Sequence, residues 1–440
     1  MTLREEIRNL STDVNKIIDF VMTGADRGVT YDELAVFIDK FGSRFVGTAN
    51  LENSIDYMLD RLTREGHDIV GSEKLSVPIW QRGKEWAQMV SPFEKKLNIL
   101  SLGYSVGTNG RVLRGDVVVV KSFDELKQRS HEVKGKFVVF NYAYESYNTA
   151  APYRLNGASE AAKYGAIAAL IRSVTDFSID SPHTGANEYK YKNAIKIPAV
   201  SITVEDAELF GRLCARGKTV RVSLYMEARM NGTGVSRNTI SEITGSHYAD
   251  EIVIVSGHLD SWDVGTGAMD DGGGCFASWR ALSVLKKLGL QPKRTIRSIL
   301  WTGEEMGMLG AKAYVNEHKH ELQKVSLAME SDEGTWAPHG WTYSGSNPIG
   351  KCIMSEILKL LAPLNSTNLY LETKGPDIAE LMQKGVPGSH LQTHCEHYFY
   401  FHHTNGDTMT VENTDDLDRN TAVIAATAYA VASIDVMLPR

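Results

Sequence analysis

The chain has 440 residues, of which 42% are hydrophobic and 23% charged, and its formal net charge is −7 at pH 7. This length allows two or three domains with substantial hydrophobic cores, and the composition is that of an ordinary globular protein. The negative charge balance argues against nucleic acid and against an anionic membrane surface as partners.

The two ends of the chain have the patterns of helices. Residues 1–20 alternate charged and apolar side chains without an uninterrupted apolar stretch, so we expect the chain as given to lack a signal peptide. Residues 421–438 are rich in alanine and interrupted by Asp435, which is typical of a buried core helix. We therefore expect no membrane span.

Cysteine spacing and glycosylation sequons leave the cellular compartment open. The 4 cysteines are far apart and form no C-x-x-C pair, so they predict neither a zinc knuckle nor a dense disulfide framework. The N-x-S/T sequons are compatible with a secreted glycoprotein, and they lie at Asn9, Asn231 and Asn365.

In the first half of the chain, the predicted secondary structure changes near residue 113. Helices are predicted over residues 31–42 and 50–66, followed by strand-like pieces. From residue 113 the chain has short β-rich runs and a helix that Thr203 is expected to cap. The Gly-, Asn- and Ser-rich residues 230–238 are predicted to form a linker. We therefore predict a β-rich module inserted into a larger domain, with boundaries at 1–112, 113–235 and 236–440.

The second half repeats a strand, loop and helix pattern. Strands are predicted at residues 251–257, 295–302 and 325–331, and helices at 275–289 and around 304–318. Such alternation predicts the α/β class, with a mixed, largely parallel sheet flanked by helices. Ligands of such sheets bind at the C-terminal ends of the strands.

Acidic and histidine side chains follow these predicted strands or lie in loops. Sheet geometry is expected to bring them to one edge, where so many carboxylates repel one another unless a cation lies among them. Taken alone, each motif is more typical of a turn, a helix N-terminus or a packed histidine; their joint order favours a metal site. The set is His258, Asp260, Asp270, Asp271, Glu304, Glu305, Asp332 and His403.

A charge count favours two divalent ions at this edge. Asp270, Glu305 and Asp332 bring three negative charges and a bridging hydroxide brings a fourth, which balances two divalent cations. His258 and His403 complete the candidate ligand set, and two imidazoles among oxygens favour zinc over magnesium or calcium. Manganese or cobalt are possible substitutes.

Two further acidic residues are predicted to act in catalysis. Asp260, two residues after His258, is predicted to orient that imidazole with its carboxylate and not to bind metal. Glu304, beside the candidate ligand Glu305, is predicted to be the general base for a metal-activated water.

Other functions compete with this interpretation. Residues 103–107 match the G-x-S-x-G motif of serine hydrolases, but turn and strand patterns follow Ser105 where that motif needs a helix, so we expect a glycine-rich turn. A non-catalytic, receptor-like protein is a second alternative, disfavoured because all candidate ligands and the base are present. Asp377 is a candidate for binding a substrate ammonium, although a solvated loop is expected there.

The segments HLDSWDVGTGAMDDGGG, WTGEEMG, MESDEGT and FHHTNGDTMTV resemble, in this order and spacing, the di-zinc aminopeptidase and glutamate carboxypeptidase family. The resemblance implies that Asp270 bridges two zinc ions, with His258 and Asp332 on one and Glu305 and His403 on the other. It also implies that Glu304 is the general base. His403 is preferred to His402 because Asp407 follows His403 by the four residues of the family pattern.

The resemblance carries further expectations. It implies a protease-associated domain as the insert at residues 113–235, and a di-zinc exopeptidase fold for the remainder. It implies a carboxypeptidase or dipeptidase acting on short peptides with free termini; an aminopeptidase of the same family is the alternative. A secreted or lysosomal homodimer is expected by resemblance alone.

Overall fold

The computed structural model describes residues 2–191 and 194–440, which form two compact units. The first unit contains the residues up to Val77, Val235–Tyr398 and Asp407–Arg440, and the second contains Pro78–Gly234 and Phe399–Gly406. The chain passes from one unit to the other within strands β1 (Ile69–Gln81) and β10 (Arg229–Ile243).

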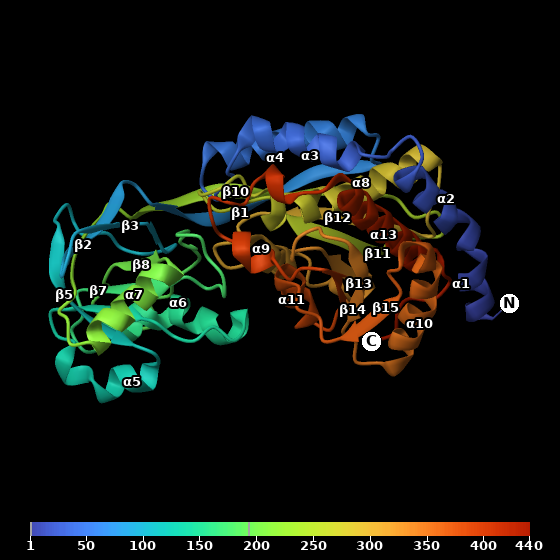
Figure 1. Cartoon of the computed structure of the whole chain (residues 1–440). Coiled ribbons are helices and arrows are strands. Elements are labelled where there is room, and N and C mark those ends of the chain that lie inside the picture. The colour runs from blue at the N-terminus through green and yellow to red at the C-terminus, as the bar shows by residue number, and fades with distance from the viewer. Residues whose placement is uncertain (1, 192–193) are drawn as a thin grey trace. The chain divides into compact units, whose positions relative to one another are not determined.

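The first unit is built on a mixed sheet with the strand order β1-β10-β12-β11-β13-β16-β14-β15 (Figure 1). The central strands β12, β11, β13 and β16 are parallel, whereas β10 pairs antiparallel with β12 and β14 antiparallel with β16. The remaining strands of this sheet are β11 (Tyr248–His258), β12 (Arg294–Trp301), β13 (Val325–Glu330), β14 (Pro338–Tyr343), β15 (Asn368–Leu371) and β16 (Gly388–Thr393). The predicted α/β class with a mixed, largely parallel sheet is confirmed.

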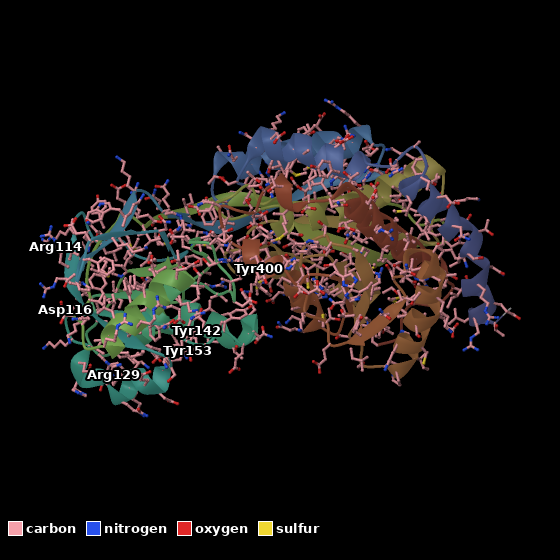
Figure 2. The ribbon with its side chains drawn as sticks, viewed as in Figure 1. Arg114, Asp116, Arg129, Tyr142, Tyr153 and Tyr400 are labelled. Atoms are coloured by element: carbon pink, nitrogen blue, oxygen red, sulfur yellow. The ribbon has the colours of Figure 1, made fainter. Side chains whose placement is uncertain are left out.

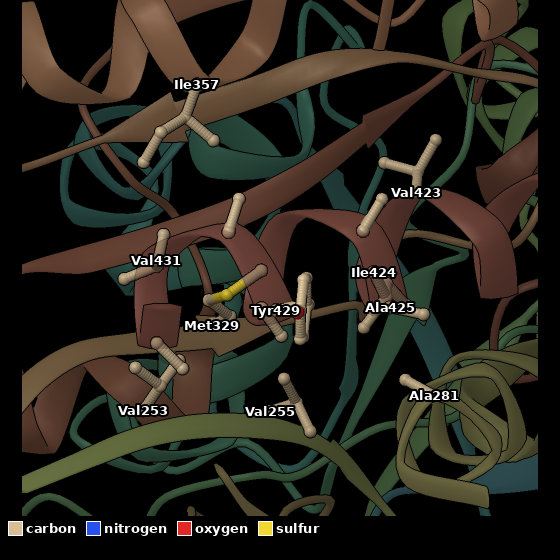
Figure 3. Close-up of a cluster of buried hydrophobic side chains, with 14 of the residues drawn as sticks. Val253, Val255, Ala281, Met329, Ile357, Val423, Ile424, Ala425, Tyr429 and Val431 are labelled. Atoms are coloured by element: carbon tan, nitrogen blue, oxygen red, sulfur yellow. The ribbon is translucent and has the colours of Figure 1, made fainter. Parts of the chain in front are cut away.

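Helices cover both faces of this sheet because its central strands are apolar on both sides. Val253 and Val255 of β11 belong to one buried cluster, whereas Ile252 and Ile254, which alternate with them, belong to another. The first cluster includes residues of α2 (Ser11–Met22), α8 (Gly273–Leu288), α10 (Pro348–Leu358) and α13 (Thr414–Ser433), and Figure 3 shows part of it. The second includes residues of α9 (Leu309–Glu317) and α11 (Pro376–Met382). The other helices of this unit are α1 (Leu3–Asn9), α3 (Val29–Phe41), α4 (Ala49–Arg64) and α12 (Tyr398–Phe401), the last of which continues into the second unit.

The second unit has its own sheet, with the order β3-β2-β9-β5-β6-β7-β8-β4. Strands β5 to β8 are parallel neighbours, and α6 packs against them. The rings of Tyr142 and Tyr153, which Figure 2 labels, stack in this core with centroids 4.5 Å apart. Its elements are β2 (Glu85–Ser91), β3 (Lys95–Leu97), β4 (Ile99–Ser101), β5 (Leu113–Val120), α5 (Phe123–Gln128), β6 (Phe137–Phe140), α6 (Tyr147–Ala162), β7 (Ala168–Arg172), β8 (Ala199–Ile202), α7 (Val204–Ala215) and β9 (Arg221–Met226).

Local signals in the sequence placed several elements correctly. Thr203 caps α7, with its side-chain oxygen accepting from the backbone N–H of Asp206. The alanine-rich C-terminal segment is the buried helix α13. Within the described residues, the helices are all too short or too polar to cross a membrane.

Two expectations about the insert differ from the structure. Residues 230–238 were expected to form a linker, but they belong to β10, where pairing with β1 supplies the backbone partners that a loop would take from water. The second unit begins at Pro78 and not at residue 113, because β2 pairs with β9 and β4 pairs with β8. Residues before 113 thus complete the second sheet.

The core of the first unit generates a stability prediction. Met329 of β13 is 1% exposed and lies in the cluster of Figure 3, so Met329→Ala is expected to lower the free energy of unfolding by about 2–5 kcal/mol. Met230, which is 43% exposed, is the control, and Met230→Ala is expected to change it by less than about 0.5 kcal/mol. Urea titrations of both variants measure the difference, and equal effects would contradict the assignment of this core.

Candidate metal centre

The ends of three neighbouring parallel strands bring the predicted polar residues of the first unit together. His258 is the last residue of β11, which pairs in parallel with β12 on one side and β13 on the other. Glu304 and Glu305 follow β12, and Asp332 follows β13. The expected gathering at the C-terminal edge of the sheet is therefore observed for these residues.

The imidazole of His258 is surrounded by carboxylates. Its Nε2 lies 3.1 Å from Oδ1 of Asp270, 3.4 Å from Oδ1 of Asp332 and 3.9 Å from Oε2 of Glu304. His258 is 1% exposed, so water screens these charges poorly. The arrangement is stable only if protons or a cation offset the negative charge.

Asp260 orients His258 differently from the prediction. The Nδ1–H of His258 donates to the main-chain oxygen of Asp260 over 2.8 Å, whereas the nearer carboxylate oxygen is 3.7 Å away. That carboxylate accepts from the backbone N–H groups of Glu304, at 3.1 Å, and Glu305, at 3.4 Å. Asp260 thus fixes the loop that carries the candidate base, while its backbone fixes the imidazole.

Asp271 contacts the backbone at the same edge of the sheet. Its Oδ2 accepts from the backbone N–H of His258 over 3.0 Å. Two glycines leave room for this carboxylate, because a Cβ at Gly257 would lie 2.5 Å from Oδ2 and one at Gly274 would lie 2.3 Å from Oδ1. The glycines of this motif are therefore required by the close approach of Asp271.

Burial and mutual repulsion change the protonation of the cluster. Burial, together with the nearby Asp332, raises the pKa of Glu304 to about 8. Burial and Asp270 raise the pKa of Glu305 well above its usual value. Burial alone would lower the pKa of His258, but Asp332 and Asp270 outweigh it and raise that pKa well above 6.5. The repulsion behind these shifts would be relieved by protons or by a bound cation.

The donor atoms fit divalent metal ions. One ligand atom from each of His258, Asp270 and Glu305 lies within 4.8 Å of the others, and the same holds for His258, Asp271 and Asp332. Imidazole with carboxylates is a ligand set suited to zinc. The first trio contains predicted ligands only. The second adds Asp271, which belongs to the predicted acidic set but not to the predicted ligands.

His402 and His403 lie in the second unit. The Nδ1–H of His403 donates to the carbonyl oxygen of Thr184 over 3.2 Å, which orients its ring. The rings of His402 and His403 stack with centroids 3.5 Å apart, and the carbonyl oxygen of His402 accepts from Nδ1 of His183. The ligand role of His403 stays a prediction.

The second unit also buries an arginine that the sequence did not single out. Arg154 of α6 is 6% exposed and donates from Nη2 to the hydroxyl of Tyr147 over 2.8 Å. Its Nε and Nη1 have no hydrogen-bond partner among the described residues. Tyr147 in turn contacts the ring of His402, with centroids 5.5 Å apart.

The segment beside Arg154 carries a second unsatisfied side chain. A Cβ at Gly185 would lie 2.5 Å from the guanidinium, and the backbone N–H of Glu188 donates to the carbonyl of Leu155. Asn187 lies between these contacts and is 1% exposed, yet neither its amide nitrogen nor its amide oxygen has a hydrogen-bond partner among the described residues. Buried polar groups of this kind need a partner from outside the described residues, such as water, an ion or a polar ligand.

Two other candidates from the sequence have structural explanations. The Ser105 hydroxyl donates to the carbonyl of Val106 and accepts from the N–H of Ala199, and no helix follows it in this described part of the chain. This geometry disfavours a serine nucleophile. Asp377 is fully buried and not on a solvated loop, because Glu330 accepts its backbone N–H at the start of α11.

Comparisons with known proteins identify the class. Residues 238–428 match the family model of peptidase family M28. Carboxypeptidase Q of Mus musculus is 46% identical over 438 residues, covering 100% of this chain and 93% of that protein. The crystal structure of a peptidase M28 precursor from Shewanella amazonensis has a TM-score of 0.93 at 31% identity, covering 99% of both chains. A zinc aminopeptidase from Bacillus subtilis shares the fold, with a TM-score of 0.70 at 20% identity over 92% of this chain and 95% of that one.

Fold and relatives therefore define a metallopeptidase. The chain belongs to peptidase family M28, and the family resemblance inferred from the motifs is confirmed.

The glycine beneath the site generates a second prediction. A Cβ at Gly274 would lie 2.2 Å from the carbonyl oxygen of Ser331 as well as against Asp271, so Gly274→Ala must displace the backbone beside Asp332. We expect the free energy of unfolding to fall by about 1–3 kcal/mol. Gly71→Ala is the control, since nothing lies within 4 Å of its Cβ. Urea titration distinguishes them, and a Gly274→Ala protein as stable as the wild type would refute this explanation of the motif.

Proposed function

We propose that the protein is a zinc-dependent exopeptidase that hydrolyses dipeptides and short peptides with free termini, using two zinc ions. The observation that carries this proposal is the buried cluster around His258, where the carboxylates of Asp270, Glu304 and Asp332 face one imidazole. The residues proposed to hold the ions are His258, Asp270, Glu305, Asp332 and His403.

Bound zinc would supply an acidified water and polarise the peptide carbonyl. Glu304 takes a proton from the attacking water and delivers it to the leaving amine as the peptide bond breaks. Its partly exposed side chain, 3.9 Å from Nε2 of His258, suits this exchange with a substrate. Asp260 holds Glu304 in place through the backbone N–H of that residue.

A carboxypeptidase or dipeptidase must bind a free carboxylate, and a buried arginine of the second unit supports this activity over aminopeptidase activity. Arginine is the preferred partner of carboxylates, and Arg154 has two buried N–H groups without a partner among the described residues. Contacts within the second unit connect this guanidinium through Tyr147 and His402 to His403, the proposed ligand. We propose that Arg154 and Asn187 bind the substrate's C-terminal carboxylate.

The remaining proposals rest on family resemblance. The second unit is proposed to be a protease-associated domain that limits the substrate to short peptides. A secreted or lysosomal homodimer is proposed on the same basis. Aminopeptidase activity is the competing outcome of the first experiment below.

The zinc mechanism predicts chelator-sensitive activity that depends on Glu304. The purified protein is assayed on unblocked, N-acetylated and C-amidated dipeptides, with and without chelator, beside Glu304→Gln. We expect chelation to abolish hydrolysis and Glu304→Gln to lower kcat about 10²- to 10⁴-fold, because the glutamine cannot accept the proton. Chelator-resistant cleavage would overturn the zinc mechanism. Cleavage that needs only a free N-terminus would make the protein an aminopeptidase.

Carboxylate recognition predicts a substrate-dependent effect of Arg154→Met. Loss of a buried charge pair is expected to lower kcat/KM for free-carboxylate peptides about thirtyfold to a few thousandfold, while C-amidated peptides are cleaved at an unchanged low rate. The matched control is Arg114→Met, since Arg114 is an exposed arginine of the same unit (Figure 2). An equal loss on both substrate types would exclude carboxylate binding by Arg154.

A further inference from the structure

Loop 259–270 connects β11 to the turn that carries Asp270, and regular secondary structure supports little of it. Most of its residues are buried, so their backbone groups need partners that a helix or sheet would otherwise provide. Two side chains that are distant from the loop in sequence supply several of these partners. They are Arg44, between α3 and α4, and Asp407, four residues after His403.

Arg44 donates hydrogen bonds to carbonyl groups of the loop. It is fully buried, and its Nε donates to the carbonyl of Leu259 over 2.7 Å. Nη1 donates to the carbonyl of Thr266 over 2.7 Å, and Nη2 to that of Gly267 over 2.8 Å. The backbone N–H of Arg44 also donates to the hydroxyl of Ser261 over 2.9 Å. One guanidinium therefore connects both ends of the loop.

Asp407 accepts hydrogen bonds from N–H groups of the loop. Its Oδ1 accepts from the backbone N–H of Met269 over 2.8 Å, and its Oδ2 from that of Asp270 over 3.2 Å. Its main-chain oxygen accepts from the N–H of Thr266 over 2.7 Å. Side-chain donors therefore meet the carbonyl groups of the loop, and side-chain acceptors meet its N–H groups.

The contacts of these two side chains differ from those of the proposed ligands. In the described residues, the groups of imidazole and carboxylate atoms suited to metal do not include Asp407. Arginine is not a metal ligand because its guanidinium has donors only. Both residues contact the backbone of the loop, and Asp407 holds the N–H of Asp270 itself.

We propose that Arg44 and Asp407 are positioning residues that hold loop 259–270 in its ligating form before metal binds, and so raise the affinity for zinc. This inference rests on the proposed function, because it assigns the loop to a zinc site. Pre-ordering removes the cost of fixing the loop when the ion arrives. Loss of residues that orient metal ligands typically weakens metal binding 10- to 100-fold.

The test uses Arg44→Lys and Asp407→Asn in the full-length protein. Lysine cannot match the planar donors that reach three loop carbonyls, and asparagine presents an amide group where Asp407 accepts from the backbone. Arg280→Lys is the matched control, because Arg280 is also fully buried in the first unit but pairs with Asp26 and not with the loop.

Two measurements are made on each variant. Competition with a chelator gives the zinc dissociation constant, which we expect to rise about 10- to 100-fold in Arg44→Lys and Asp407→Asn and less than about threefold in Arg280→Lys. Hydrogen exchange of the metal-free protein is expected to be faster in peptides covering residues 259–270 for the first two variants only. If Arg44→Lys fails to fold, Asp407→Asn decides the result.

The outcomes separate this inference from the proposed function. A wild-type protein that binds no zinc would overturn the proposed function, while hydrogen exchange would still test whether the two residues order the loop. Unchanged loop exchange in the folded variants would overturn the positioning role. If exchange is faster but zinc affinity is unchanged, the two residues order the loop without raising the affinity for zinc, which would overturn the proposed effect on metal binding.

Discussion

Repulsion among carboxylates at one edge of the first sheet is the constraint on which the rest of this structure depends. Parallel strands end at the same edge, so the loops after β11, β12 and β13 place their acidic residues close together. Burial then makes their simultaneous ionisation costly, as the raised pKa of Glu305 indicates. A divalent cation is the simplest way to keep the carboxylates ionised and in place, which gives this edge its chemistry.

Much of the first unit was predictable because its signals are local. Alternating strand and helix patterns gave the α/β class, and the alanine-rich segment was correctly expected to be a buried helix. The misassigned residues 230–238 show where local signals fail. Glycine and asparagine favour turns, but the extended form of β10 is stabilised by β1, far away in the sequence. The extent of the second sheet was missed for the same reason, since β2 and β9 are paired across a long stretch of chain.

In the site, too, some features could be predicted from the sequence and others could not. Side chains such as those of His258, Asp270 and Glu305 were singled out from residue type and position, and the structure brings those three together. Their roles as ligands stay predictions. Contacts through the main chain were not visible in the sequence. His258 is oriented by the carbonyl of Asp260 and not by its carboxylate, a distinction that depends on backbone geometry. Asp377, expected in solvent, is buried because α11 begins against Glu330.

Two buried arginines show why structure is needed to separate a supporting residue from a candidate for ligand binding. Removing a guanidinium from water is costly unless its N–H groups find partners. Arg44 finds them in the carbonyls of loop 259–270, so its cost is offset within the folded chain. The Nε and Nη1 groups of Arg154 find no such partner among the described residues, so a carboxylate arriving from outside would stabilise them. Both residues are buried arginines, and only the state of their hydrogen bonds separates them. That difference is the basis on which we propose a positioning role for Arg44 and a substrate-binding role for Arg154.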